Sequence, residues 1–245
     1  FSRQMVLSQE PTTRFYSDSV FIKLLVQCLK VPHSFYYTFD SVNTISKLYA
    51  PDSSFRIFTW QLQMDESYYR QYGAIQINMP DGSLKLFPLT DVSEFTPVPT
   101  DTVRTPKNWI GAIYYKIIPV VFGDKKYYTL FGLDDNDFAS TKKWIEVLSF
   151  DDKDTPIFGG KFFEYKEDAM KPLQPAYRFC IEFKKDANAR LVYDQERKMI
   201  VFDHLISESS EPAKKYTLIP YGTFEGFKWT NGKWLHVPNL FPQDK

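Results

Sequence analysis

From Phe55 onward the chain is a succession of short β-branched and aromatic runs separated by turn residues. The clearest run alternates apolar and polar side chains, with Tyr177, Phe179, Ile181 and Phe183 on one side and Arg178, Cys180, Glu182 and Lys184 on the other. Because successive side chains of a strand point to opposite faces, this alternation predicts a strand with one face packed and the other near water.

Turn residues divide these runs. Residues 231–232 are Asn-Gly, the pair most typical of a two-residue hairpin loop, and residues 80–83 are Pro-Asp-Gly-Ser. The runs between such turns predict roughly twelve to fourteen strands. The expected fold is all-β, an antiparallel up-and-down meander that closes into a barrel, forms two packed sheets or makes a degenerate propeller.

Helix signals are confined to the N-terminal part of the chain. Apolar residues at helical spacing begin after Asp18 and end before Pro32, which predicts a helix over residues 18–30. Residues 1–16 are polar and mixed, and we expect them to form an extended arm. A second, shorter helical turn is expected after Asp40.

These signals predict one structural unit made of two parts. Residues 1–50 are expected to be an arm and helices that pack on a sheet, and residues 51–245 an antiparallel β domain. Two long segments without strand pattern, residues 91–108 and 164–176, are rich in proline and polar residues. Long loops in compact domains are often functional, so both are candidate rims of a binding site.

Charge and cysteine content narrow the function classes. Thirty Lys and Arg balance thirty Asp and Glu, so the positive potential that nucleic-acid binding needs is absent, and we expect no nucleic-acid partner. No apolar run reaches the roughly 18 residues of a membrane-spanning helix.

Cys28 is expected on the apolar face of the helix and Cys180 inside a strand, which favours two separate buried thiols over one disulfide.

Several stretches carry a resemblance. Residues 39–41 read Phe-Asp-Ser, residues 53–60 Ser-Ser-Phe-Arg-Ile-Phe-Thr-Trp, residues 72–76 Tyr-Gly-Ala-Ile-Gln and residues 127–132 Tyr-Tyr-Thr-Leu-Phe-Gly. In them the chain resembles, from Phe39 to Trp234, a family of uncharacterised bacterial proteins that are often exported and have no assigned activity. The resemblance implies export and transfers no site residue. A start at Phe1 without methionine also fits a removed leader, so the expected location is periplasmic or extracellular.

The last hairpin is the leading candidate site. With the Asn-Gly loop in place, Trp229 lies opposite Trp234 and Phe227 opposite His236, so all four rings share one face with Glu225. If this face is open, the rings would stack on a sugar or aromatic ligand while Glu225 and His236 bind its hydroxyls. If it is turned inward, the same cross-strand pairs stabilise the sheet.

No recognisable catalytic or cofactor motif is present, and no cofactor is expected. Residues 134–137 read Asp-Asp-Asn-Asp but lack the glycine that a calcium loop of the EF-hand type needs, so they are interpreted as a solvated turn. His33, His204 and His236 have no short ligand spacing. We therefore expect no metal site.

Three functions remain open. The first is a non-catalytic exported β-domain that binds a carbohydrate, peptide or protein partner through surface aromatics. The second is a hydrolase with a carboxylate pair, for which Glu225 and Glu182 are candidates, in a cleft roofed by the two long loops; its sign would be a carboxyl group of raised pKa beside a second acid. The third is a scaffold component of an envelope assembly, marked by a large exposed apolar patch.

Overall fold

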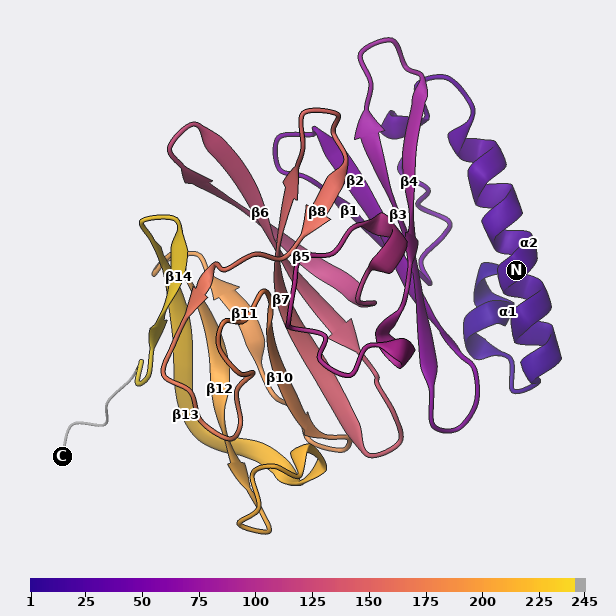
Figure 1. Cartoon of the computed structure of the whole chain (residues 1–245). Coiled ribbons are helices and arrows are strands. Elements are labelled where there is room, and N and C mark those ends of the chain that lie inside the picture. Colours follow the sequence, from indigo (N-terminus) through magenta and orange to yellow (C-terminus); the bar gives the residue numbers. More distant parts are fainter. Residues whose placement is uncertain (241–245) are drawn as a thin grey trace.

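The fold of the chain, a computed structural model that describes residues 1–240, is mostly β (Figure 1). The last five residues of the expected β domain, 241–245, lie outside the described residues. The helices and strands are α1 (Ser2–Leu7), α2 (Pro11–Leu29), β1 (Ser46–Tyr49), β2 (Phe55–Gln63), β3 (Tyr69–Asn78), β4 (Leu84–Thr90), β5 (Ile113–Phe122), β6 (Lys125–Asp134), β7 (Ser140–Phe150), β8 (Pro156–Phe158), β9 (Phe163–Glu164), β10 (Phe179–Lys184), β11 (Leu191–Asp194), β12 (Met199–Ser207), β13 (Leu218–Thr230) and β14 (Lys233–Val237).

The strands form three sheets. The N-terminal sheet has the order β1-β2-β3-β4, the central sheet has the order β10-β7-β6-β5 with β8 beside β7, and the C-terminal sheet has the order β11-β12-β13-β14-β9. All neighbouring strands are antiparallel except β14 and β9, which are parallel. The antiparallel all-β prediction with a short N-terminal helical segment is therefore confirmed, and none of the three sheets of the described chain closes into a barrel.

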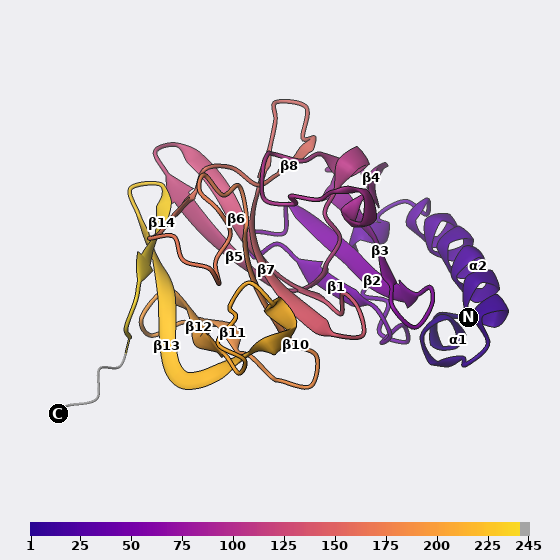
Figure 2. The same ribbon diagram turned by 60° about the horizontal axis from the view of Figure 1, so that its bottom comes forward.

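The sheets are stacked in layers, with the helices on the outside (Figures 1 and 2). The helices pack on the outer face of the N-terminal sheet, where Phe21 of α2 meets Trp60 of β2. A second core lies between the N-terminal and central sheets, and a third lies between the central and C-terminal sheets. Strand β7 contributes to both of these cores, with Leu148 in one and Val147 in the other.

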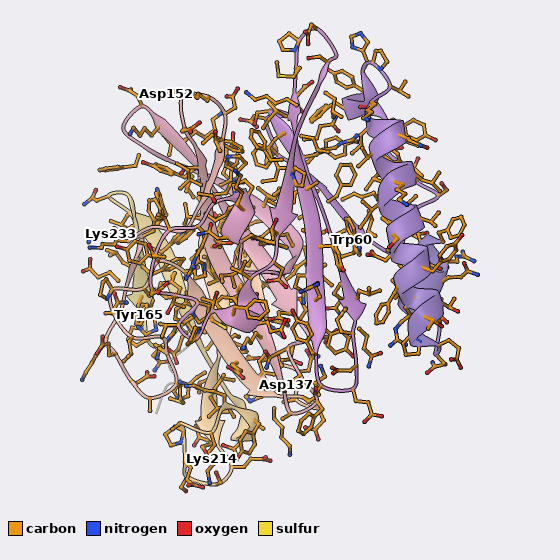
Figure 3. The ribbon with its side chains drawn as sticks, turned by 45° about the vertical axis from the view of Figure 1, so that its right-hand side comes forward. Trp60, Asp137, Asp152, Tyr165, Lys214 and Lys233 are labelled. Atoms are coloured by element: carbon orange, nitrogen blue, oxygen red, sulfur yellow. The ribbon has the colours of Figure 1, made fainter. Side chains whose placement is uncertain are left out.

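The N-terminal segment differs from the expectation. The predicted arm is helical, since α1 spans Ser2–Leu7 and α2 begins at Pro11, where a proline fits the first turn because its missing N–H needs no partner. The helix therefore begins before the expected residue 18, and Asp18 lies within it. The Asp18 carboxylate accepts a hydrogen bond of 2.9 Å from the indole Nε1 of Trp60, which points toward α2 in Figure 3. Neither α-helix of residues 1–240 has the length and apolar character that crossing a membrane requires.

Two further expectations at this end are wrong. The segment after Asp40 forms no helical turn; it continues into strand β1, whose Leu48 pairs with Ile57 of β2, because pairing along the edge of the N-terminal sheet satisfies its backbone. Cys28 is exposed, because the buried stripe of α2 runs through Leu25 and Leu29 instead. Both thiols are free, with Cys180 half-buried on β10.

Turn and loop expectations fare better. Thr230 pairs with Lys233 across the Asn-Gly loop, and both loop residues have positive φ, as a type I′ hairpin requires. The acidic turns that hold Asp137 and Asp152 lie at opposite ends of the β6–β7 hairpin, as Figure 3 shows. The interpretation of residues 134–137 as a solvated turn is wrong at Asp134, which is 7% exposed because its side chain turns inward to Gln71.

The loop of residues 91–108 is held in place by a buried ion pair. Arg178, with no exposed surface, donates from Nε to Glu146 Oε1 at 2.6 Å, and its Nη1 donates to the carbonyl oxygens of Pro99 and Thr102. The other oxygen of Glu146 accepts a 2.7 Å bond from the hydroxyl of Tyr114. The central sheet thus fixes this loop over its own edge.

Candidate functional site

The last hairpin has the expected register but faces inward. Trp229 pairs with Trp234, and Phe227 pairs with His236. The side chains of Phe227 and Trp234 have no exposed surface, and the Trp234 indole donates a 3.0 Å hydrogen bond to the Thr129 hydroxyl of the central sheet. The aromatic face of this hairpin, which was expected to bind a ligand, is therefore part of the core between the central and C-terminal sheets. The inner face of one sheet is covered by the next sheet.

Trp229 lies at the tip of the same hairpin and is half-buried. Its indole Nε1 donates a 2.9 Å hydrogen bond to the carbonyl of Val121, at the tip of the β5–β6 hairpin. The ring also lies against Tyr127 and Phe162. Trp229 therefore joins two hairpins and does not form an open stacking surface.

Glu225 and His236 do reach a cavity. This open cavity of about 750 Å³, here called the Glu225 cavity, lies between strands β12 and β13 and the loop of residues 164–176. The Glu225 carboxylate lies 2.5 Å from His236 Nε2, 2.5 Å from His204 Nδ1 and 3.0 Å from Lys171 Nζ. Burial raises the pKa of Glu225, but the bonds from His236, His204 and Lys171 outweigh burial and hold this pKa at about 2. Glu225 is thus a firmly ionised carboxylate.

A second, smaller cavity lies beside the first. It has a volume of about 240 Å³ and is called the Cys180 cavity; it shares Lys171 with the Glu225 cavity. Glu182 lines it, and its Oε1 accepts a 2.6 Å hydrogen bond from the Ser140 hydroxyl. The Cys180 thiol lies there as well, and burial raises its pKa well above the usual value.

A third cavity, of about 280 Å³, adjoins the second and is called the Asp134 cavity. The two have four lining residues in common, which are Pro97, Pro99, Lys142 and Trp144. Asp137 and Tyr165, labelled in Figure 3, line the two outer cavities of the row. The three cavities therefore form a row, and the two long loops that the sequence marked as rims border it.

The central sheet supplies the floor of the Cys180 and Asp134 cavities. Asp134 of β6 pairs with Lys142 of β7, which in turn pairs with Glu182 of β10. Two residues further along β7, Trp144 pairs with Cys180 of β10. Because alternate residues of a strand share a face, these side chains lie on the same side of the sheet. The polar side that the alternation of residues 177–184 predicted is thus the side that faces the cavities.

Asp134 is the acid of the row whose pKa is raised. Its Oδ1 accepts hydrogen bonds from Gln71 Nε2 at 3.0 Å and from the Asn136 amide at 2.8 Å. Burial raises its pKa to about 6, and the nearby carboxylates of Asp91 and Asp135 add to the rise, against the Asn136 bond and the charge of Lys142. The raised pKa beside further acids that the hydrolase hypothesis required is therefore present, although not at Glu225.

The acids beside Asp134 are already engaged. Asp91 Oδ1 accepts from the Ser93 amide at 2.9 Å and from the Gly111 amide at 3.1 Å, while its Oδ2 accepts from the Gln71 amide at 3.0 Å. Asp135 accepts from the side-chain amide of Gln61. Neither carboxylate is free to act as a nucleophile or base without breaking contacts that shape the loop.

Two residues that line the Asp134 cavity each carry a buried polar atom that has no hydrogen-bond partner among the described residues. These atoms are Oε1 of Gln71, an acceptor, and Nε1 of Trp144, a donor. The two residues are 2% and 4% exposed, respectively. A buried polar atom without a partner lowers stability by about 1–3 kcal/mol, so a ligand that bonds to these atoms would gain from the contact.

Sequence reasoning found part of this site. It named Glu225, His236 and Glu182, and it noted no short ligand spacing among the three histidines. The structure brings His204 and His236 to the two oxygens of Glu225, while His33 lies beyond the N-terminal sheet, beside Gly82. A break in the β12–β13 register between Asp203 and Leu205 falls at His204, and no sequence signal marks it.

The described residues contain no group of three or more His, Cys, Asp or Glu side chains placed to hold a metal ion. Asp134, Trp144 and Gln71 were missed by sequence reasoning. The one signal that pointed toward them was the proline-rich loop that covers them.

Comparison of the chain with protein-family models, curated proteins and solved structures finds no match. The resemblance to an exported bacterial family therefore stays a prediction, as does a periplasmic or extracellular location.

Proposed function

We propose that the protein binds an oligosaccharide along the row of three cavities and does not cleave it. The observation that carries this proposal is the row itself, which runs beneath both long loops and shares lining residues from one cavity to the next. An extended chain of sugar units matches a succession of small open cavities better than a compact ligand does, because each cavity can hold one part of the chain.

The residue types of the row support a sugar. Tyr68, Tyr69 and Trp144 line the Asp134 cavity, and Tyr165 lines the Glu225 cavity. On the central sheet, Lys142 lies between two carboxylates, since it pairs with Asp134 on one side and with Glu182 on the other. Ring faces stack on the apolar faces of sugars, and charged side chains hydrogen-bond to hydroxyl groups, so this mixture favours a polar, hydroxyl-rich ligand.

A hydrolase is the second candidate, favoured by the raised pKa of Asp134. Carboxylate-pair hydrolysis needs a second available acid at a defined separation. Asp91 and Asp135 are held by other bonds, and Glu225 is ionised and lies at the other end of the row. Binding without cleavage is therefore the better-supported function. Incubation with bound oligosaccharides would decide, since new reducing ends would show that the protein cleaves them.

Tryptophan fluorescence tests the proposal with a matched pair of variants. A panel of neutral, amino and acidic oligosaccharides and cell-wall fragments is titrated into the wild type, Trp144→Phe and Trp229→Phe. Trp144 lines the row, whereas Trp229 is bonded at the hairpin tip. We expect a ligand that changes the emission of the wild type and of Trp229→Phe, with weaker binding by Trp144→Phe. A panel without effect on the wild type, or equal effects in both variants, would refute the proposal; binding of a peptide library alone would replace the sugar by a peptide.

A further inference from the structure

We infer that the Asp134 cavity binds a primary ammonium group, so that the ligand of the row is an amine-bearing saccharide. This inference deepens the proposed function and rests on it for the rest of the ligand. It arises from three observations on the cavity: its charge, its unpartnered atoms and the engagement of its other acids.

The Asp134 carboxylate of this cavity has no cation in direct contact among the described residues, whereas the Glu94 carboxylate is paired with Arg70 at 3.9 Å. Four carboxylate residues line it, which are Asp91, Glu94, Asp134 and Asp137. Lys142 is the one lysine or arginine among its lining residues, and its ammonium group donates a 2.7 Å hydrogen bond to Asn136 Oδ1. No cationic nitrogen of residues 1–240 lies within 4.0 Å of the Asp134 carboxylate. A buried carboxylate without a cation favours a positively charged ligand.

The unpartnered atoms match an amino sugar. An ammonium group is a donor with three N–H bonds, and the cavity offers it two kinds of acceptor, the carboxylate of Asp134 and the free Oε1 of Gln71. The free Nε1 of Trp144 is a donor, and an ammonium group cannot accept from it. A hydroxyl or ring oxygen next to the amine can. The aromatic rings of Tyr68 and Trp144 add surfaces on which a cation is stabilised.

A divalent metal ion fits the cavity less well. Hard cations need several oxygen ligands at once. Both carboxylate oxygens of Asp91 accept hydrogen bonds from backbone amides, those of Gln71, Ser93 and Gly111. The Asp135 carboxylate accepts a hydrogen bond from the side chain of Gln61. No grouping of three acidic, histidine or cysteine side chains suited to a metal occurs in the described chain. Of the other two lining acids, Glu94 is paired with Arg70, and Asp137 accepts from the backbone amides of Ala139 and Ser140. The cavity therefore suits a single positive charge better than a metal ion.

Binding of an ammonium group is expected to depend on pH. Burial raises the pKa of Asp134 to about 6, and a bound cation would lower this pKa by stabilising the ionised form. Linkage then requires that binding releases a proton near pH 6 and weakens as the pH falls through this value. A neutral ligand in the same cavity would show no such weakening.

The first experiment uses a minimal probe and its neutral analogue. Ethanolammonium and ethylene glycol are titrated into the whole protein, and the indole N–H signal of Trp144, identified by its loss in Trp144→Phe, is followed by NMR. We expect ethanolammonium to shift this signal at about pH 7.5 and to bind at least tenfold more weakly at about pH 5, on either side of the Asp134 pKa. Equal binding of the two probes, no binding of ethanolammonium, or no dependence on pH would overturn the inference.

Two variants locate the charge. Asp134→Asn keeps an oxygen that accepts from Gln71 and Asn136, and it should weaken ethanolammonium binding about tenfold. Asp18→Asn is the matched control, because Asp18 is also a buried acid whose pKa burial raises, yet it belongs to α2 and lines none of the three cavities. It should bind as the wild type does. If Asp134→Asn fails to fold, the pH dependence of the wild type still decides the outcome.

The second experiment separates this inference from the proposed function. Calorimetry compares three tetrasaccharides of the same linkage that carry amino, acetamido or hydroxyl groups at the second carbon. A clear preference for the amino form, lost in Asp134→Asn, is the expected result. Equal affinities would keep oligosaccharide binding and overturn the ammonium site. Binding of ethanolammonium without binding of any tetrasaccharide would keep the site for an amine and overturn the proposed oligosaccharide.

Discussion

Replacement of Arg178 by methionine tests whether one buried ion pair holds the roof of the cavity row. Methionine keeps much of the side-chain volume and removes the guanidinium group. Glu146, 2% exposed, would then be left as a buried carboxylate with the Tyr114 hydroxyl as its remaining partner. The carbonyl oxygens of Pro99 and Thr102 would lose their donor at the same time.

The expected loss of stability is large. Removal of one member of a buried ion pair destabilises proteins by about 3–5 kcal/mol, because the other charge stays buried without compensation. For a chain of this size, this corresponds to a fall in Tm of roughly 10 °C. The double variant Arg178→Met with Glu146→Gln removes both charges, so it should lose less than the sum of the two single losses.

Chemical denaturation measures the free energies of unfolding, and hydrogen exchange measures protection of residues 91–108. Lys233→Met is a control, because Lys233 pairs with Glu164 where both side chains are at least half exposed, and such a pair contributes about 0–1 kcal/mol. We expect faster exchange in the loop for Arg178→Met alone. A loss below about 1 kcal/mol, or unchanged exchange in the loop, would show that the ion pair does not hold this segment.

Three further predictions concern single side chains. Trp234→Ala should lose about 3–5 kcal/mol of stability because the indole is fully buried, while Trp229→Ala should lose clearly less; equal losses in denaturant titrations would contradict this assignment of Trp234 to the core. Glu225 has a folded pKa of about 2 against 4.5 in model compounds, so its stabilisation is present above pH 4.5 and is lost as the pH falls toward 2; Glu225→Gln should lack that part of the acid unfolding curve. Asp134 has the opposite shift, from 3.8 to about 6, so stability should fall as the pH rises through this window, and Asp134→Asn should remove the fall; an unchanged profile would refute the raised pKa.

The all-β fold could be predicted because its signals are local. Strand β10 alternates buried and half-buried residues along its whole length, and the Asn-Gly loop fixes the β13–β14 register. The stacking of three sheets could not be predicted in this way. Residues 144–148 of β7 are buried without a break, since one face meets the N-terminal sheet and the other meets the C-terminal sheet. Such a strand shows no alternation that reveals which face meets which layer.

The same layering explains why the aromatic face of the last hairpin is buried and does not form the expected binding surface. From the sequence, a face with Phe227, Trp229 and Trp234 looks alike whether it is open or covered. Whether the face is open depends on the central sheet. The hydroxyl of Thr129 in that sheet accepts a hydrogen bond from the Trp234 indole, although the two residues are far apart in the sequence. The polar contacts of the site are long-range as well. Gln71 reaches Asp134, and Lys171 reaches Glu225, so neither pair leaves a spacing signature in the sequence.

The two ends of the cavity row differ in how their carboxylates are balanced. Glu225 is surrounded by His204, His236 and Lys171, so folding itself supplies its partners. Asp134 accepts two hydrogen bonds but has no cation in direct contact among the described residues, and its ionisation at neutral pH opposes folding. An asparagine could accept the same two hydrogen bonds through its amide oxygen without this loss. A carboxyl group that lowers the stability of the free protein, in a cavity with a free acceptor beside it, is therefore better explained by a cation that binds after folding than by any need of the fold.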